Sequence, residues 1–76
     1  MIRELQSIVL LTDLNKYGLK AGDIGTVVLV HEQGAGFEVE FITLDGETVA
    51  IVTLFADQVR PIGEWEIAHV RPLETA

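Results

Sequence analysis

The sequence contains no cysteine, few basic residues and no long apolar run. Without cysteine no disulfide can reinforce the fold, and such a composition suits a reducing compartment. The longest apolar stretches, residues 26–30 and 49–55, fall far short of the roughly 18 residues that a membrane-spanning helix needs. The apolar run from Ile8 to Leu11 is too short for an export signal. We therefore expect a cytoplasmic protein with no membrane span.

Acidic residues dominate the charge of the chain. There are 12 acidic and 5 basic residues, which gives a formal net charge of −7. The basic residues are scattered along the chain, whereas a surface that follows nucleic-acid phosphates needs them clustered. The composition argues against nucleic acid and favours a basic partner protein. A plainer interpretation, that the acids simply solvate the surface, stays open.

The 76 residues are enough for one compact domain and too few for two separate cores. Turn-forming glycine and aspartate residues separate runs rich in Val, Ile, Thr and Phe, as is typical of strands and hairpins. The expected strands are Ile8–Leu11, Ile24–Glu32, Phe37–Leu44, Glu47–Phe55 and Val59–Pro61. This pattern predicts an all-β fold, a small five-stranded SH3-like barrel over residues 1–62, followed by a C-terminal tail over residues 63–76.

The dipeptide Asp45-Gly46 predicts a two-residue type I′ turn, which places Leu44 opposite Glu47. Counting onward from this turn and from the loop before Phe37 pairs apolar residues on one face. These pairs are Val39 with Val52, Phe41 with Ala50, Phe37 with Leu54, Val30 with Val39, and Val28 with Phe41. The predicted core consists of Ile24, Val28, Val30, Phe37, Val39, Phe41, Ala50, Val52 and Leu54, joined by Val9, Leu11, Leu19 and Val59 from the closing segments.

The same register places an unusual number of aliphatic residues on the outer face. This face holds Val27, Leu29, His31, Glu38, Glu40, Ile42, Val49, Ile51 and Thr53. Clustered exposed aliphatics mark an interface, so something should cover them. The tail, as a strand or as a helical turn, is one candidate, and another chain is the second. The predicted partner-binding residues are Val27, Leu29, Ile42, Val49, Ile51, Trp65, Ile67 and Val70.

Groups that support catalysis or metal binding are scarce in this sequence. With two histidines, no cysteine and Ser7 as its one serine, the chain can hardly assemble a nucleophile, a base and an orienting group. A cross-strand pair of His31 and Glu38 is more typical of a surface contact, and structural zinc sites need four ligands. We therefore expect no enzyme, no catalytic residue, no cofactor and no metal.

Two glycines open the strand that begins at Ile24. Gly22 and Gly25 bracket a sharp entry, where a side chain would clash or the backbone needs positive φ. A phosphate-binding loop requires its glycines to open a helix instead, which argues against a nucleotide.

Several segments together resemble a bacterial family. The run LKAGDIGTVV at residues 19–28, FEVEF at 37–41, DGETVA at 45–50 and IAHVR at 67–71 are similar to the family called domain of unknown function 4926. The resemblance implies an SH3-like fold and no established activity. It also implies a role beside small toxin-type proteins, because family members look like companions of such proteins. The glycine block is similar as well to the opening of translation-factor KOW barrels.

Three function classes follow from these observations, and a protein-binding module leads. Its most concrete version is an antitoxin or immunity-type partner of a small, basic, toxin-like protein, and a homo-oligomer is the other protein partner considered. The alternatives are a nucleic-acid- or ribosome-associated KOW-like barrel and, last, an enzyme.

Overall fold

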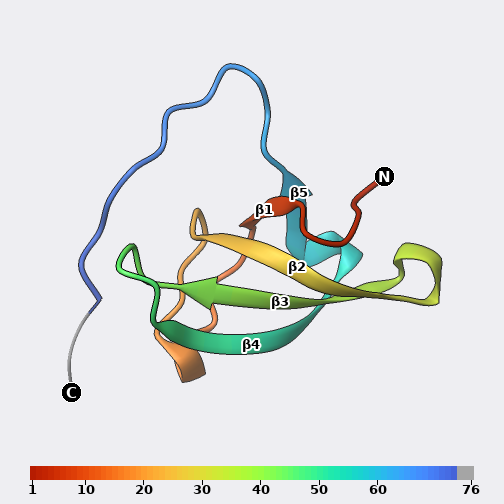
Figure 1. The fold of residues 1–76 in the computed structure, drawn as a ribbon, viewed down its shortest axis with the longest axis horizontal. Helices are drawn as coiled ribbons and strands as arrows, with labels where there is room; N and C mark the ends of the chain where they lie inside the picture. Colours follow the sequence, from red (N-terminus) through yellow and green to blue (C-terminus); the bar gives the residue numbers. More distant parts are fainter. Residues whose placement is uncertain (74–76) are drawn as a thin grey trace.

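The structure, a computed structural model, describes residues 1–73. Its elements are β1 (Ser7–Leu10), η1 (Asn15–Tyr17), β2 (Ile24–His31), η2 (Glu32–Gly34), β3 (Gly36–Ile42), β4 (Thr48–Phe55), η3 (Ala56–Gln58) and β5 (Val59–Pro61). The three η elements are single 3-10 turns (Figure 1). The all-β fold and its five strands are thus as predicted. Within the described part of the chain, no helix has the length and apolar character that crossing a membrane requires.

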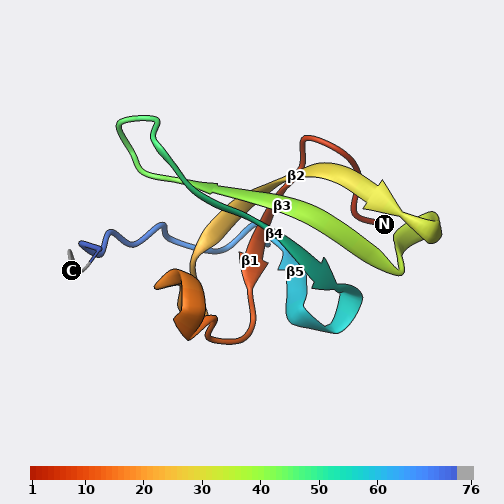
Figure 2. The same cartoon turned by 90° about the horizontal axis from the view of Figure 1, so that it is seen from below.

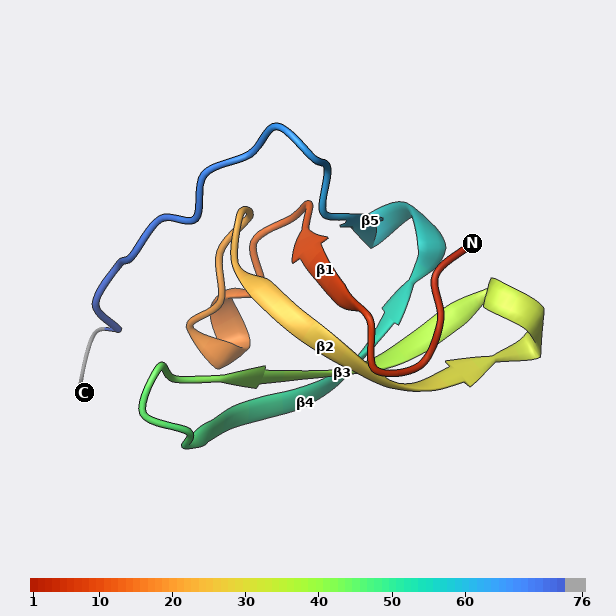
Figure 3. The ribbon, with the colours of Figure 1, turned by 45° about the horizontal axis from the view of Figure 1, so that its top comes forward.

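The five strands form one antiparallel sheet in the order β4-β3-β2-β1-β5. The long strands β2, β3 and β4 make one layer, and the short strands β1 and β5 lie across it (Figures 1 and 2). The sheet bends round on itself without closing, so β4 and β5 are its two edges (Figure 3). This is the expected small SH3-like arrangement in open form.

The core lies inside this bend and is entirely apolar. Its residues, all 7% exposed or less, are Ile8, Leu10, Leu19, Val27, Phe37, Val39, Phe41, Val52, Leu54 and Val59. The β3–β4 pairs Phe37–Leu54, Val39–Val52 and Phe41–Ala50 are those that the sequence predicts. Alternation of apolar and acidic residues along β3 makes this part of the register unambiguous.

The β3–β4 turn differs from the predicted two-residue type. The Gly46 N–H donates to the Thr43 carbonyl at 3.0 Å, and the Thr43 N–H donates to the Glu47 carbonyl at 2.8 Å. Gly46 has a φ of +94°, as a glycine turn position should, but it is the last residue of a four-residue turn over residues 43–46. The Thr43 hydroxyl binds both Asp45 and the Glu47 N–H, which stabilises this longer turn. The register therefore slips by one residue between Phe41 and Ile42.

Strand β2 contains a bulge that the sequence analysis missed. Val27 lies opposite Val39, and the register then shifts before Leu29. Val27 is therefore fully buried, whereas Val28, predicted in the core, is 39% exposed. Ile24 is also exposed, so its predicted core position is wrong too. The extra residue of a bulge reverses which side chains face inward, and a uniform aliphatic run gives no sign of it.

In β1, too, the residues that face the core are the opposite of those predicted, so the phase of the strand is reversed. Ile8 and Leu10 are buried, whereas the predicted Val9 and Leu11 are not. Ile8 lies opposite Gly25, where a Cβ atom would stand 2.5 Å from the Val39 Cγ1 atom. Gly25 therefore allows the close approach of Val39 and Phe41, as the clash argument expected. Gly22, three residues earlier, has a φ of +97°, so it is the glycine at which the backbone needs positive φ.

Beyond β5 the chain forms an arch. Residues 62–73 contain neither helix nor strand, so the described tail takes neither of the two predicted forms. The arch leaves the barrel at β5 and returns near the β3–β4 turn (Figure 1). The predicted tail also includes residues 74–76, which lie outside the described residues.

Candidate functional site

The outer side of the β2–β3–β4 layer carries acidic and apolar side chains in adjacent rows. Leu29 lies opposite Glu38, which in turn lies opposite Thr53. Glu40 lies opposite Ile51 in the next row. On β3 and β4 these residues alternate with core residues, so they point away from the core. We call this surface the acidic face and define it as Leu29, Glu38, Glu40, Ile51, Thr53 and Phe55.

Hydrogen bonds fix both carboxylates of the acidic face. The Thr53 hydroxyl donates to Glu38 Oε2 at 2.7 Å, and His31 Nε2 lies 2.7 Å from the same oxygen. The bond from Thr53, and then that from His31, holds the pKa of Glu38 below its usual range. The Thr48 hydroxyl donates to Glu40 Oε2 at 2.8 Å. The carboxylates are therefore positioned before any partner arrives, which lowers the entropy cost of binding.

Three large apolar side chains accompany these carboxylates. Leu29 is 44% exposed, Ile51 is 56% exposed and Phe55 is 64% exposed. Single exposed aliphatics are common in small proteins, but here they stand among fixed acids on one layer. A surface that offers both apolar area and oriented charge suits a protein partner.

Charge is divided sharply between two parts of the molecule. The sequence has no Lys or Arg between Lys20 and Arg60, and this interval contains all of β2, β3 and β4. Seven carboxylates fall in the same interval: Asp23, Glu32, Glu38, Glu40, Asp45, Glu47 and Asp57. The basic residues belong to the N-terminal segment, the loop before β2, β5 and the tail. The β2–β3–β4 layer therefore presents a field of one sign.

The predicted partner-binding residues do not all lie together. Leu29 and Ile51 lie on the acidic face, but Val27 is 0% exposed and belongs to the core, because the β2 bulge turns it inward. Ile42 and Val49 lie at the end of the sheet, beside the β3–β4 turn. There they line a cavity rather than the acidic face.

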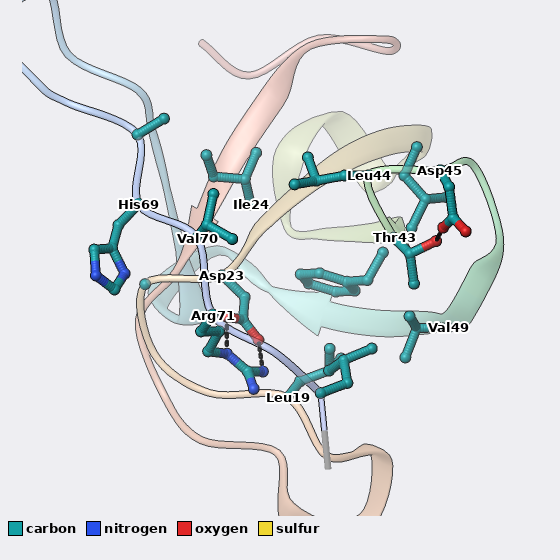
Figure 4. A pocket seen from close by; sticks show the side chains of 15 residues that line it. Leu19, Asp23, Ile24, Thr43, Leu44, Asp45, Val49, His69, Val70 and Arg71 are labelled. Carbon is teal, nitrogen blue, oxygen red and sulfur yellow. Dashed lines mark hydrogen bonds and ion pairs between the residues drawn. The ribbon is translucent and has the colours of Figure 1, made fainter. Parts of the chain in front are cut away.

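This cavity, of about 480 Å³, lies between the end of the sheet and the returning tail. Figure 4 shows Ile24, Leu44, Val49 and Val70 around it, so its lining is largely apolar. The full lining is Leu19, Gly22, Asp23, Ile24, Phe41, Ile42, Thr43, Leu44, Asp45, Val49, Ala68, His69, Val70, Arg71 and Leu73. Residues of the tail thus line this cavity together with Ile42 and Val49, although Ile42 is still 52% exposed.

An ion pair holds the end of the tail against the barrel. Arg71 Nε donates to Asp23 Oδ1 at 2.8 Å, and Arg71 Nη2 donates to Asp23 Oδ2 at 2.5 Å (Figure 4). Arg71 Nη2 also donates to the Gly18 carbonyl at 3.0 Å. Burial acts to raise the pKa of Asp23, but the bonds from Arg71 and from the Lys20 N–H together outweigh it and lower that pKa.

A second ion pair holds the beginning of the tail. Arg60, on β5, donates to the two Glu66 oxygens at 2.8 and 2.6 Å. The Gly63 N–H also donates to Glu66. The bond from Arg60 and then that from Gly63 lower the pKa of Glu66 to about 2. The arch is therefore tied to the barrel near both of its ends.

The tail's largest apolar side chains do not cover the acidic face. Trp65 is 99% exposed and Ile67 is 98% exposed. The expectation that they bury the outer aliphatics is wrong for Leu29 and Ile51, which remain exposed. Both side chains of the arch are instead exposed to solvent.

Comparison with known proteins gives one match. The sequence profile of the family described as Domain of unknown function (DUF4926) matches residues 4–61. The chain belongs to the DUF4926 family. No curated protein and no solved structure matches the chain. The DUF4926 match covers β1 to β5 and confirms the resemblance there, while the likeness noted for residues 67–71 lies outside it.

The DUF4926 domain offers fixed carboxylates and apolar area rather than a ligand cage. Among residues 1–73, no group of three or more His, Asp or Glu residues could hold a metal ion. His31 and Glu38 meet as expected, but Glu40 bonds to Thr48 instead of joining them. What the acidic face can do chemically is accept hydrogen bonds and positive charge beside an apolar surface.

Sequence reasoning missed several features of this DUF4926 domain. Phe55 was assigned to the end of a strand and not to the outer face, although alternation from the core residue Leu54 indicates its direction. The pair of Asp23 and Arg71 spans 48 residues, and no local pattern signals it. The lack of basic residues between Lys20 and Arg60 is visible in the sequence, but it gains meaning only when the topology places that interval in one layer.

Proposed function

We propose that this DUF4926 domain is a non-catalytic protein-binding module whose acidic face binds a basic partner protein. The observation that carries the proposal is the charge division, since the β2–β3–β4 layer lies within an interval of seven carboxylates and no Lys or Arg. Complementary charge steers encounter and selects the partner. The exposed side chains of Leu29, Ile51 and Phe55 supply apolar area at the same surface.

The form of this function that we favour is an antitoxin or immunity-type role in the cytoplasm of a bacterium. In this form the acidic face neutralises a small, basic, toxin-like protein. The support is the resemblance stated above, together with the net charge of −7 and the lack of cysteine, which suits a reducing compartment. A toxin that acts on nucleic acid needs a basic surface, and an acidic face is the complement of such a surface.

The test is a capture experiment with two matched baits. The tagged wild-type domain and the double variant Glu38→Gln, Glu40→Gln are each incubated with extract of the native host, with and without nuclease. We expect one basic protein to be enriched on the wild type, to be depleted at least tenfold on the variant and to resist nuclease. That protein is then produced alone, and its binding is measured by calorimetry.

Two outcomes contradict the proposal. Equal enrichment on both baits would show that the carboxylates of the acidic face do not contribute to binding. Enrichment of RNA, lost with nuclease, would support the nucleic-acid-associated barrel instead. Because the substitutions replace two partly exposed carboxylates outside the core with isosteric amides, they leave the core unchanged.

A further inference from the structure

Among residues 1–73, no backbone hydrogen bond joins the outer edge of β4 to another strand or loop. The sheet order places β4 at one end, beside β3 alone (Figure 1). The Ala56 N–H donates to the Ala35 carbonyl, which identifies Gly36 and Phe55 as a pair that is not mutually hydrogen-bonded. Such pairs alternate along an antiparallel ladder, so Thr53 and Ile51 also direct their N–H and C=O groups away from β3. Their side chains are exposed as well.

This edge lacks the features by which proteins protect edge strands. The eight residues of β4, TVAIVTLF, include no charged residue and no proline. From Ala50 to Phe55 the register is regular, with no bulge to twist the edge away. The opposite edge, β5, is three residues long and contains Arg60 and Pro61. Short length, charge and proline are the usual defences of an edge strand, so β5 is protected and β4 is not.

We propose that the β4 edge, from Ile51 to Phe55, accepts an added strand from a partner protein, and that the strand is basic. This inference rests on the proposed function and specifies how the partner binds. Main-chain hydrogen bonds to Ile51 and Thr53 supply affinity in this mode, and alternate side chains supply specificity. The Phe55 N–H is already bound by the Gln58 side chain at 2.8 Å, which sets the end of the added strand.

The carboxylates near β4 determine which kind of strand can bind at its edge. A strand added beside β4 lies about 5 Å from it and about 10 Å from β3, within reach of a lysine or arginine side chain directed at Glu38 and Glu40. Asp45 and Glu47 precede β4, and Asp57 follows it. A second copy of this chain brings the same carboxylates, and the one Lys or Arg residue in its described strands is Arg60 of the three-residue β5, so like charges oppose its pairing. A partner strand with alternating Lys or Arg residues matches the site.

The test uses two capped octapeptides, one alternating lysine with valine and one alternating glutamate with valine. Binding to the full chain is measured by calorimetry, and amide exchange is followed by NMR. We expect the lysine peptide to bind at least tenfold more tightly than the glutamate peptide. We also expect the lysine peptide to slow hydrogen exchange of the Ile51 and Thr53 amides selectively. This measurement uses the wild-type chain alone.

A matched pair of variants isolates the edge. Thr53→Pro removes an N–H that faces away from β3, whereas Thr53→Ala keeps this N–H and removes only the hydroxyl and methyl groups of the side chain. We expect Thr53→Pro to bind the lysine peptide at least tenfold more weakly than Thr53→Ala, with NMR spectra confirming that both are folded. A charge pair provides a second comparison: Ile51→Lys should weaken binding of the lysine peptide and Ile51→Glu should strengthen it.

The outcomes separate this inference from the proposed function. If Thr53→Pro binds as Thr53→Ala does, while Glu38→Gln, Glu40→Gln loses binding, the acidic face binds the partner and strand addition is wrong. If the two peptides bind equally, or if neither binds at millimolar concentration, the proposal that the β4 edge accepts a basic strand is wrong. If the wild type forms a dimer and Thr53→Pro dissociates that dimer, the β4 edge binds a second copy of the chain. The proposal of a basic partner strand is then wrong as well.

Discussion

The barrel and the tail hold their apolar side chains in opposite ways. In the barrel, Val27 is 0% exposed because the β2 ladder and its bulge direct it inward. In the tail, Trp65 is 99% exposed although it is the largest apolar side chain of the chain. The barrel is fixed by its strand ladder and its core, whereas the tail is fixed by two ion pairs. Apolar character therefore predicts burial only where a strand fixes the direction of the side chain.

The largest effect is expected from a core truncation in β1. Ile8→Ala removes a side chain that is 0% exposed and should lower the free energy of unfolding by about 3 kcal/mol. Val9→Ala, at the half-exposed neighbouring position, should cost less than about 1 kcal/mol. Urea denaturation measures both. If the two variants lose the same free energy of unfolding, Ile8 is not the residue of β1 that faces the core. The contrast between a barrel whose strands direct side chains inward and a tail without strands would then be weaker.

The next effect concerns the close approach at Gly25. Gly25→Ala places a Cβ atom 2.5 Å from Val39 Cγ1 and 2.9 Å from Phe41 Cε1, so we expect a loss of about 2 kcal/mol. In a Val39→Ala background the first of these clashes is absent, and the cost of Gly25→Ala should fall. The same cost in both backgrounds would show that the close approach of Val39 is not the cause of the loss.

A smaller effect is expected at the β3–β4 turn. Gly46 has a φ of +94°, which a β-branched residue strongly resists, so Gly46→Val should cost about 1 kcal/mol or more. Gly46→Asn should cost less, because asparagine tolerates positive φ. Thermal melting compares the two. Identical melting temperatures would mean that the backbone at this turn can relax.

How far the sequence predicts this fold depends on the local pattern. Phe37 to Phe41 alternates apolar and acidic residues, so the faces of β3 and β4 are correctly predicted from Phe37 to Phe41 and from Ala50 to Leu54, before the register slips. The run from Thr26 to Val30 is apolar after its first residue, and the bulge inside it leaves no trace in the sequence. The same uniformity hides the phase of Ile8 to Leu11, in which Ile8 lies opposite Gly25 of β2.

The candidate site is predictable to a similar degree. Leu29, Ile51 and the carboxylates of β3 were placed on the outer face, because the β3–β4 register determines most of that face. Val27 was misplaced through the bulge. The position of the tail follows from ion pairs that join Asp23 to Arg71 and Arg60 to Glu66, and side-chain pairing across loops has no periodic signature.

The smallest effect on the barrel, and the sharpest test of the tail, is acid release of the arch. Glu66 has a pKa of about 2 in the folded chain against 4.5 ordinarily, because it accepts bonds from Arg60 and Gly63. Its contribution is fully present above pH 4.5 and is lost as the pH falls toward about 2. The lowered pKa of Asp23 makes the Arg71 anchor weaken in the same direction.

Fluorescence anisotropy of Trp65, the one tryptophan in the sequence, reports this release while circular dichroism follows the barrel. Anisotropy should fall as the pH is lowered from 4.5 toward 2, before the β signal is lost, because a detached arch reorients faster than the domain. In Glu66→Gln the charge is absent throughout, so its anisotropy should already be lower at neutral pH and should change less. If anisotropy and circular dichroism change together in the wild type, and Glu66→Gln behaves identically, the arch is part of the cooperative barrel. The distinction between a core-held and an ion-pair-held region would then be wrong.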